Sequence, residues 1–282
     1  MIKSFLTRLL TSCFILAIFA VMVVASFFEI WFELTISLLS MLCIYEAVNA
    51  IGFSKKKRIL IPSMAYAFLV PLSFVFVEQI QKSPYYLIII LTFLYLIGFM
   101  LMSMLNFKTI KFNDAATITF VSLVITCFLS NIILLRRAPQ NGLFYMILVI
   151  VCFAWCTDIF AYLVGICIGK HKFAPNISPK KSIEGAIGGT TFSVIATVIA
   201  LVIYQNVSGC TINYPLAILY AFICSVVGQV GDLSFSYIKR SYNIKDFGKI
   251  LPGHGGVLDR LDSLIFISPF FYMLITLKQF II

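Results

Sequence analysis

Nine long apolar stretches dominate the sequence and restrict the chain to a membrane fold. A stretch of about 20 apolar residues is long enough to cross the hydrocarbon core of a bilayer as a helix. Backbone groups in lipid have no water to pair with, so such a segment has to be helical. The predicted spans are residues 9–28, 30–51, 59–77, 84–105, 114–135, 143–168, 186–205, 215–237 and 261–282. We therefore predict an all-α, polytopic membrane protein with about nine transmembrane helices.

The composition excludes an ordinary soluble domain. Hydrophobic residues make up 61% of the chain and charged residues 11%, whereas soluble domains are about half apolar and about a quarter charged. The formal net charge is +10, which in a soluble protein would suggest a nucleic-acid partner. In a membrane protein, cationic loops fix the orientation and face anionic lipid headgroups. We therefore expect membrane lipids as partners and no nucleic acid.

The basic residues also predict the orientation. If the nine spans alternate, 17 of the 21 Lys and Arg residues fall on the side of the N-terminus. Loops rich in Lys and Arg stay in the cytoplasm. We expect a multi-pass protein of the inner (plasma) membrane of the cell, with its N-terminus in the cytoplasm and its C-terminus outside.

Two polar connections suggest how the chain is organised. Residues 169–185 and 238–260 are the longest connections and are rich in Gly, Pro, Lys and Asp, and both are predicted on the cytoplasmic side. Residues 1–140, with helices one to five, read as a transmembrane scaffold. Residues 141–282, with helices six to nine and these two loops, read as the catalytic region. The active site would then face the cytoplasm from the C-terminal half.

Asp158 and Asp232 are acidic residues that lie inside apolar spans. Asp232 is in the eighth predicted helix, four residues before Ser236, so both would share one helix face. A carboxylate inside a spanning helix costs about 2.5–3.5 kcal/mol on insertion scales and usually has a function. The same argument applies to Asp158 in the sixth helix. For Asp158, a buried acid held by a neighbouring Tyr or Thr is the alternative.

The second loop combines acids, bases and glycines. Asp259 and Asp262 are three residues apart at the start of the ninth helix, close enough to share a divalent cation, although helix capping would also explain them. Magnesium is bound by one or two carboxylates together with substrate phosphates, which suits acids interleaved with Lys and Arg. Gly253, Gly255 and Gly256 would either curl backbone amides around an oxyanion or make a tight loop.

The first loop resembles an anion site. Pro175 and Pro179 stop the preceding helix, and Ser178 and Ser182 are candidate caps of the next one. A helix N-terminus beside Lys180 and Lys181 attracts anions. The spacings Gly165/Gly169 and Gly185/Gly189 favour helix packing. His171 and His254, one in each loop, are candidates for acid–base chemistry or ligand contact.

These residues resemble a known signature, that of the phosphatidate cytidylyltransferase (CDP-diacylglycerol synthase) family. The matching positions are Ser236, Lys239, Arg240, Lys245, Asp246, Pro252, Gly253, His254, Gly255, Gly256, Asp259, Arg260 and Asp262. The stretch from Ser178 to Gly189, and Asp158 with the residues up to Gly169, are similar to further shared blocks. The resemblance covers about residues 155–265, and the first five helices match only in being hydrophobic.

The resemblance implies a magnesium-dependent enzyme that condenses CTP with phosphatidic acid to CDP-diacylglycerol and pyrophosphate. It implies Asp232, Asp259 and Asp262 as metal ligands, with Asp246 as a weaker candidate. The catalytic residues it implies are Asp232, Lys239, Arg240, Lys245, Asp259, Arg260 and Asp262. The substrate-binding residues it implies are Asp158, Lys181, Ser182, Glu184, Ser236, His254, Gly255 and Gly256.

Two rival functions stay open at this point. A CTP-dependent polyprenol or phytol kinase would also use magnesium, a lipid and a nucleotide, but the complete run from Pro252 to Asp262 argues against it. An ion-coupled transporter would use Asp158 and Asp232 as an ion path, and it predicts charges spread through the bilayer midplane. The sequence is compatible with a homodimer and does not decide the oligomeric state.

Overall fold

The computed structural model describes residues 17, 19–53, 57–76, 85–253 and 255–281. The chain forms two compact units. The first comprises Met1–Ile133 and Asp246–Arg260, and the second comprises Leu134–Lys245 and Leu261–Ile282. The predicted separation at residue 140 concerned scaffold and catalytic roles and stays a prediction. The compact units follow a different boundary.

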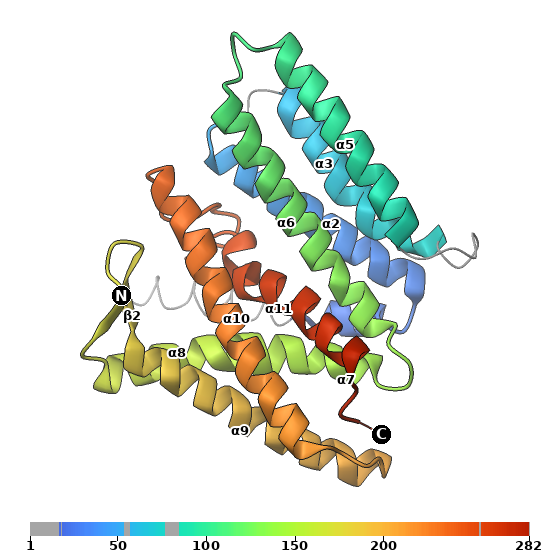
Figure 1. The fold of residues 1–282 in the computed structure, drawn as a ribbon, viewed down its shortest axis with the longest axis vertical. Helices are drawn as coiled ribbons and strands as arrows, with labels where there is room; N and C mark the ends of the chain where they lie inside the picture. The colour runs from blue at the N-terminus through green and yellow to red at the C-terminus, as the bar shows by residue number, and fades with distance from the viewer. Residues whose placement is uncertain (1–16, 18, 54–56, 77–84, 254, 282) are drawn as a thin grey trace. The chain divides into compact units, whose positions relative to one another are not determined.

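The first unit is a bundle of long apolar helices. Its helices are α2 (Glu29–Ala50), α3 (Lys57–Leu72), α5 (Tyr85–Leu105) and α6 (Phe112–Arg136), the last of which ends in the second unit. Helix α3 packs against both α2 and α5 (Figure 1). The Tyr66 and Tyr95 rings stack with centroids 4.4 Å apart, and the Tyr95 hydroxyl lies 3.1 Å from Ser63 Oγ. The hydroxyl groups of Ser63 and Tyr95 therefore pair with each other inside this bundle.

The second unit contains one continuous helix made of three segments, a β-hairpin and three further helices. Its elements are α7 (Gly142–Ile147), η1 (Leu148–Cys156), α8 (Thr157–Ile168), β1 (Lys172–Ala174), β2 (Ser178–Ser182), α9 (Ile183–Ser208), α10 (Tyr214–Ser241) and α11 (Leu258–Leu277), which begins in the first unit. The segment η1 is a π-helix that joins α7 and α8 without a break. Strands β1 and β2 pair antiparallel.

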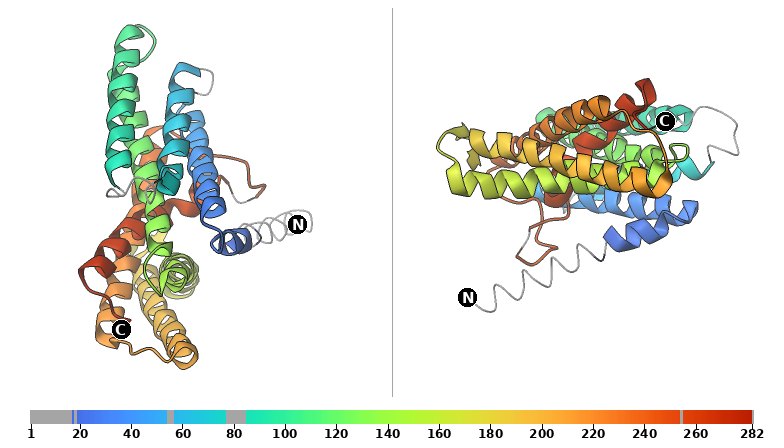
Figure 2. Two further views of the ribbon diagram at one scale, coloured as in Figure 1. Left: turned by 90° about the vertical axis from the view of Figure 1, so that its right-hand side faces the viewer. Right: turned by 90° about the horizontal axis from the view of Figure 1, so that it is seen from below.

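Glycines bring α8 and α9 into close contact, as the sequence predicted. The two helices lie side by side in Figures 1 and 2. A Cβ atom at Gly185 would lie 2.6 Å from the Ala161 carbonyl oxygen and 3.1 Å from the Gly165 Cα. A Cβ atom at Gly189 would lie 2.6 Å from the Thr157 carbonyl oxygen. Only glycine fits these contacts, because any side chain would push the two backbones apart.

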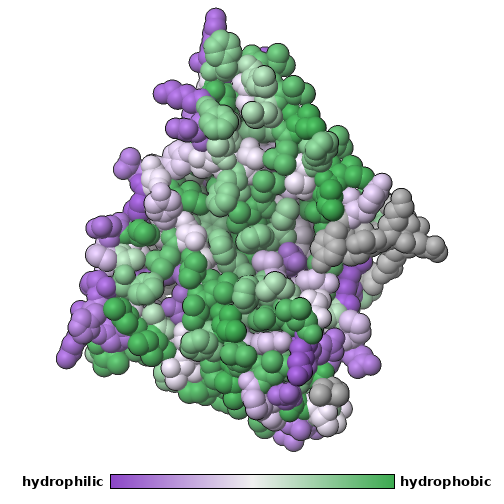
Figure 3. All heavy atoms as spheres, viewed as in Figure 1, coloured by the Kyte–Doolittle hydropathy of each residue, from purple (hydrophilic) through white to green (hydrophobic). Residues whose placement is uncertain are grey.

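The predicted all-α membrane fold is confirmed. Within the described residues, eight helices are long and apolar enough to span a membrane, and each corresponds to one of the last eight predicted spans. Of the first predicted span, 9–28, residues 9–16 and 18 lie outside the described residues, and residues 17 and 19–25 are helical. Hydrophobic side chains cover most of the helix surface that is visible in Figure 3. Such a surface suits lipid as the solvent.

Two local predictions were wrong. The last helix ends at Leu277 rather than at residue 282, because the chain leaves the helix and the Phe280 carbonyl accepts a hydrogen bond from the Asn213 N–H at 2.8 Å. Within residues 169–185, where a loop was predicted, β1 and β2 form a hairpin. The hairpin places Ser178 in β2, so it does not cap the following helix.

Candidate active site

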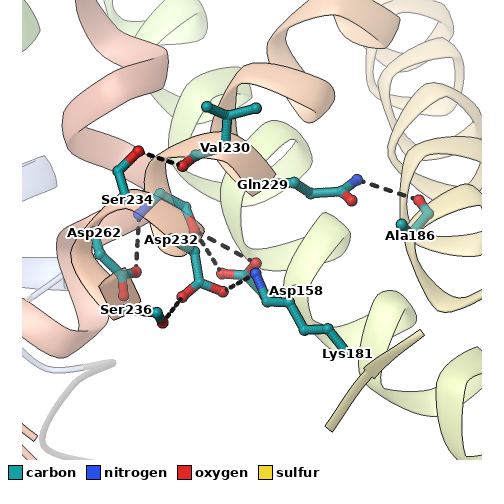
Figure 4. A network of polar contacts seen from close by, with 10 residues as sticks. Asp158, Lys181, Ala186, Gln229, Val230, Asp232, Ser234, Ser236 and Asp262 are labelled. Carbon is teal, nitrogen blue, oxygen red and sulfur yellow. Dashed lines mark hydrogen bonds and ion pairs between the residues drawn. The ribbon is translucent and has the colours of Figure 1, made fainter. Parts of the chain in front are cut away.

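Three aspartates from three helices gather in the second unit and form what we call the acid cluster: Asp158 on α8, Asp232 on α10 and Asp262 on α11 (Figure 4). The Asp262 carboxyl is within electrostatic range of the other two. Asp262 is 7% exposed and the Asp232 side chain 23% exposed, whereas Asp158 is open to the surroundings. Asp262 is therefore the buried member of the cluster, and Asp158 is its most accessible member.

Cations and hydroxyl groups surround the acid cluster. Lys181 Nζ lies 2.5 Å from Asp232 Oδ2, and Lys239, which is 8% exposed, interacts electrostatically with Asp262. Ser263 Oγ donates to Asp158 Oδ2 at 3.2 Å. Three carboxyl groups and two ammonium groups thus gather in one part of the second unit.

The expected Asp232–Ser236 pair is present. Ser236 Oγ donates to Asp232 Oδ1 at 3.4 Å across one helical turn. On α10, Gln229 Nε2 donates to the Ala186 carbonyl oxygen of α9 at 3.2 Å, which fixes the helix that carries Asp232 (Figure 4). The sequence argument for a shared helix face was therefore correct.

The β-hairpin places Lys181 beside the acid cluster. Ser182, at the end of β2, caps α9 by accepting a hydrogen bond from the Gly185 N–H at 3.2 Å, as the sequence suggested. Arg240 Nε on α10 donates to the Ile177 carbonyl oxygen in the hairpin turn at 3.1 Å. These two contacts fix both ends of β2, so the position of Lys181 is built into the fold. Contacts of Ser182 and Arg240 with a substrate stay predictions.

Glu184 closes the base of the hairpin. Its carboxylate accepts hydrogen bonds from the backbone N–H groups of Lys170 at 3.1 Å and His171 at 3.2 Å. The His171 ring Nδ1 lies 2.6 Å from Glu184 Oε1. The structure gives both side chains this local role, and substrate binding by Glu184 stays a prediction.

Carboxylates also organise the segment Asp246–Arg260, which we call the motif loop, within the first unit. Asp259 Oδ2 accepts hydrogen bonds from the Phe247 N–H at 2.9 Å and the Gly256 N–H at 3.0 Å. Gly253 and Gly255 have φ angles of 80° and 87°, a left-handed conformation that favours glycine. The Gly256 amide is used inside the loop, which favours the tight-loop interpretation over an oxyanion site.

Other predicted residues of the motif region lie at its edges. Lys245, Asp246 and Arg260 are exposed. The Asp246 side chain lies beside Gly255, as a Cβ atom there would be 3.4 Å from Asp246 Oδ1. His254 lies outside the described residues. For these four residues the predicted roles stay predictions.

Sequence reasoning missed two residues with clear contacts. Ser263 binds Asp158, but a serine next to an acidic motif gives no distinct signal. Glu46 on α2 accepts a hydrogen bond from the Leu258 N–H at 2.9 Å. The argument that singled out Asp232, a carboxylate in an apolar span, would have found Glu46 in residues 30–51.

The acid cluster fits magnesium by its donor chemistry. Among the described residues, no three His, Cys, Asp or Glu side chains stand close enough to form a complete metal cage. Magnesium does not need one, because it binds one or two carboxylates and completes its octahedron with water and substrate phosphates. The accessible carboxylates of Asp158 and Asp232 could supply those ligands.

Comparison with known proteins identifies the family. The profile of the "Cytidylyltransferase family" matches residues 6–278. The phosphatidate cytidylyltransferase of Bacillus subtilis strain 168 is 33% identical over 280 residues, which cover 96% of this chain and 97% of the relative. That of Staphylococcus haemolyticus strain JCSC1435 is 43% identical over 136 residues, or 48% of this chain and 50% of the relative. With a profile match across nearly the whole sequence and a relative aligned over 96% of it, the chain belongs to the cytidylyltransferase family.

Proposed function

We propose that the chain is a phosphatidate cytidylyltransferase, which condenses CTP with phosphatidic acid to CDP-diacylglycerol and pyrophosphate. The observation that carries this proposal is the end-to-end similarity to the Bacillus subtilis protein of that name. The acid cluster with its two lysines supports it, because this group can hold phosphates and a divalent cation together. The chain is thus a membrane-embedded nucleotidyltransferase of phospholipid biosynthesis.

The reaction needs charge control rather than a protein base. A phosphate oxygen of phosphatidic acid attacks the α-phosphorus of CTP and forms a new P–O bond. The bond from that phosphorus to the bridging oxygen breaks, and pyrophosphate leaves with the electron pair. The second pKa of a phosphate monoester is about 6, so the nucleophile is largely ionised at neutral pH. The protein has to hold two polyanions in line and stabilise the developing charge.

The second unit supplies groups for both tasks. We assign Lys181 and Lys239 to neutralise phosphate oxygens, since both ammonium groups already lie beside acid-cluster carboxylates. We assign the accessible carboxylates of Asp158 and Asp232 to hold Mg²⁺ together with substrate phosphates. The metal-ligand roles predicted for Asp262, Asp259 and Asp246 stay predictions. A bound Mg²⁺ would neutralise charge on the nucleotide phosphates. The buried position of Asp262 keeps water away from one side of the site, which strengthens electrostatic interactions there.

Reaction with purified protein tests the function. We expect pyrophosphate release from CTP only when phosphatidic acid and a divalent cation are both present, with CDP-diacylglycerol as the lipid product. CDP together with a phosphorylated alcohol would point to the kinase instead. Uptake of an ion into proteoliposomes without any nucleotide chemistry would point to the transporter. Either result would overturn the proposal.

The orientation in the membrane follows from the basic residues. We infer a cytoplasmic N-terminus and an outer C-terminus, because 17 of the 21 Lys and Arg residues fall on one side. Cysteines placed near Lys56, Lys180 or Lys249 should be labelled from the cytoplasm, and those near Asn141 or Asn213 from outside. Labelling of residues near Lys180 and Lys249 from opposite sides would contradict this topology. Lipid contacts and a homodimer stay expectations.

A further inference from the structure

The buried carboxylate of Glu46 contacts the motif loop, although the two lie far apart in the sequence. Glu46 lies in the apolar helix α2 and is 2% exposed. It accepts a hydrogen bond at Oε2 from the Leu258 N–H at 2.9 Å, across 212 positions of the sequence. Leu258 is the first residue of α11, and the first N–H groups of a helix have no partner within the helix. Glu46 therefore caps this helix from another helix.

Two glycines of the motif loop enclose the Glu46 carboxylate. A Cβ atom at Gly248 would lie only 2.1 Å from Glu46 Oε1, and one at Gly256 would lie 2.6 Å from Oε2. Neither glycine has a positive φ angle, so space rather than backbone conformation requires glycine at both positions. The backbone of the motif loop therefore packs closely around the Glu46 side chain.

Helix capping alone does not account for a glutamate at this position. A cap can come from a Ser or Asn next to the helix at little cost, whereas a carboxylate in a spanning helix is expensive. The second oxygen, Oε1, is buried and makes no hydrogen bond to the residues that the structure describes. A group that is costly and only partly paired is usually retained for function.

The loop that Glu46 shapes also holds Asp259. The Gly256 N–H donates to Asp259 Oδ2, and a Cβ atom on the same Gly256 would lie 2.6 Å from Glu46 Oε2. Leu258, which donates to Glu46, directly precedes Asp259 in the chain. A shift of Glu46 would therefore move both the residue before Asp259 and the amide that orients its carboxylate.

We propose that Glu46 is a positioning residue, which sets the conformation of the motif loop and through it the orientation of Asp259 for the cytidylyl transfer. This inference rests on the proposed function, because it assigns a catalytic purpose to the loop. Glu46 itself need not touch either substrate. Its effect should therefore appear in turnover more than in substrate binding.

The first test compares Glu46→Ala with Glu46→Gln. We expect Glu46→Ala to lower kcat about 100-fold, since misplacing a reacting group by about 1 Å has an effect of that size. The KM values for CTP and phosphatidic acid should change little. Glu46→Gln should stay within about tenfold of the wild type, because its amide oxygen can still accept the Leu258 N–H. Equal activity of the two variants, or a change confined to KM, would overturn the proposal.

A double-mutant cycle with Gly248 provides the second test. Gly248→Ala alone should lower kcat about as much as Glu46→Ala, because the added Cβ displaces the carboxylate. In the Glu46→Ala background the same change should have almost no further effect, since residues in contact are not additive. Additive losses would show that the two positions act independently and would refute the proposal. The control is Ser37→Ala. Ser37 is buried on α2, and its hydroxyl donates a hydrogen bond to the Glu33 carbonyl oxygen of the same helix.

Hydrogen exchange separates this inference from the proposed function. The amides of Phe247, Gly256 and Leu258 should exchange faster in Glu46→Ala and Gly248→Ala than in the wild type and Ser37→Ala. If the wild type makes no CDP-diacylglycerol but these amides respond as expected, only the proposed function fails. If the wild type is active and the amides do not respond, the positioning role fails.

Discussion

The acid cluster and the motif loop use the same side chain, a carboxylate, in opposite ways. In the acid cluster, Asp232 and Asp158 face an ammonium group and a hydroxyl group, which are partners that can be exchanged for a ligand. In the motif loop, Asp259 and Glu46 face backbone N–H groups, which are fixed by the fold. The first arrangement leaves carboxylates available for chemistry, and the second uses them to shape the backbone.

This difference separates Asp259 from Asp262, two residues to which the sequence analysis gave the same role. Asp259 and Asp262 are three residues apart and were both predicted as metal ligands. In the structure Asp259 Oδ2 accepts two backbone hydrogen bonds within the motif loop. Asp262 is buried in the acid cluster, and its Oδ1 accepts the N–H of the adjacent Ser263 at 2.8 Å. Shared spacing on one helix therefore does not guarantee a shared role. The following substitutions measure how far the two roles really differ.

The largest effect should come from the acid cluster. Asp232→Asn keeps the size of the side chain but removes a charge from the proposed cation site, and we expect kcat/KM to fall about 1,000-fold with the protein still folded. Steady-state kinetics with CTP and phosphatidic acid will measure this. The control Asp114→Asn, at an acid in the first turn of α6, should stay within about twofold. A loss of less than about tenfold in Asp232→Asn would remove this residue from the site.

Asp259 should give a smaller loss. In Asp259→Asn the amide oxygen can still accept the Phe247 and Gly256 N–H groups, so the loop should persist while the charge is lost. We expect kcat to fall about 100-fold, with unchanged hydrogen exchange in the loop. Asp259→Ala should lose the same activity and also loosen the loop. Near-normal turnover of Asp259→Asn would leave this residue with the structural role alone.

Helix packing around the acid cluster should affect stability instead. Gly185→Ala would place a Cβ 2.6 Å from the Ala161 carbonyl, and we expect a cost of about 1–3 kcal/mol, seen as a lower melting temperature in detergent. Gly98→Ala on α5 is the matched control, because its Cβ would meet no atom within 4 Å. That change should be neutral or stabilising by up to about 1 kcal/mol. Similar melting temperatures for the two variants would argue against the α8–α9 contact.

The smallest effect should come from Lys181, the exchangeable partner of Asp232. Lys181→Gln removes the ammonium group beside Asp232, and we expect the KM for CTP to rise about tenfold, equivalent to about 1.4 kcal/mol. The effect on kcat should be smaller. An unchanged KM for both substrates would show that Lys181 serves only to neutralise Asp232.

Much of the fold could be predicted from the sequence, because the bilayer leaves so few alternatives. Apolar length located the spans, and glycine spacing predicted the α8–α9 contact. The costly charge of Asp232 pointed to the site, and the cap at Ser182 followed from its position before a helix. In each case one strong physical preference decided the outcome.

The remainder depends on contacts between distant residues. The hairpin at 172–182 forms where Pro and Lys suggested only a loop, since a three-residue strand has too little pattern to detect. Glu46 and Leu258 are 212 positions apart, so nothing local indicates that they meet. The motif indicated the candidate site residues, whose roles stay predictions, but it did not show which of them would accept hydrogen bonds from the motif loop and which would lie in the acid cluster.

The π-helix η1 has a consequence for how this protein tolerates changes in length. It runs from Leu148 to Cys156 and ends two residues before Asp158. Because η1 joins α7 and α8 as one continuous helix, a change in its length would alter the direction in which Asp158 points relative to α7. Insertions and deletions in the connections between helices would leave that direction unchanged. This apolar stretch, which carries no motif, should therefore tolerate apolar replacements of similar size but very little change in length.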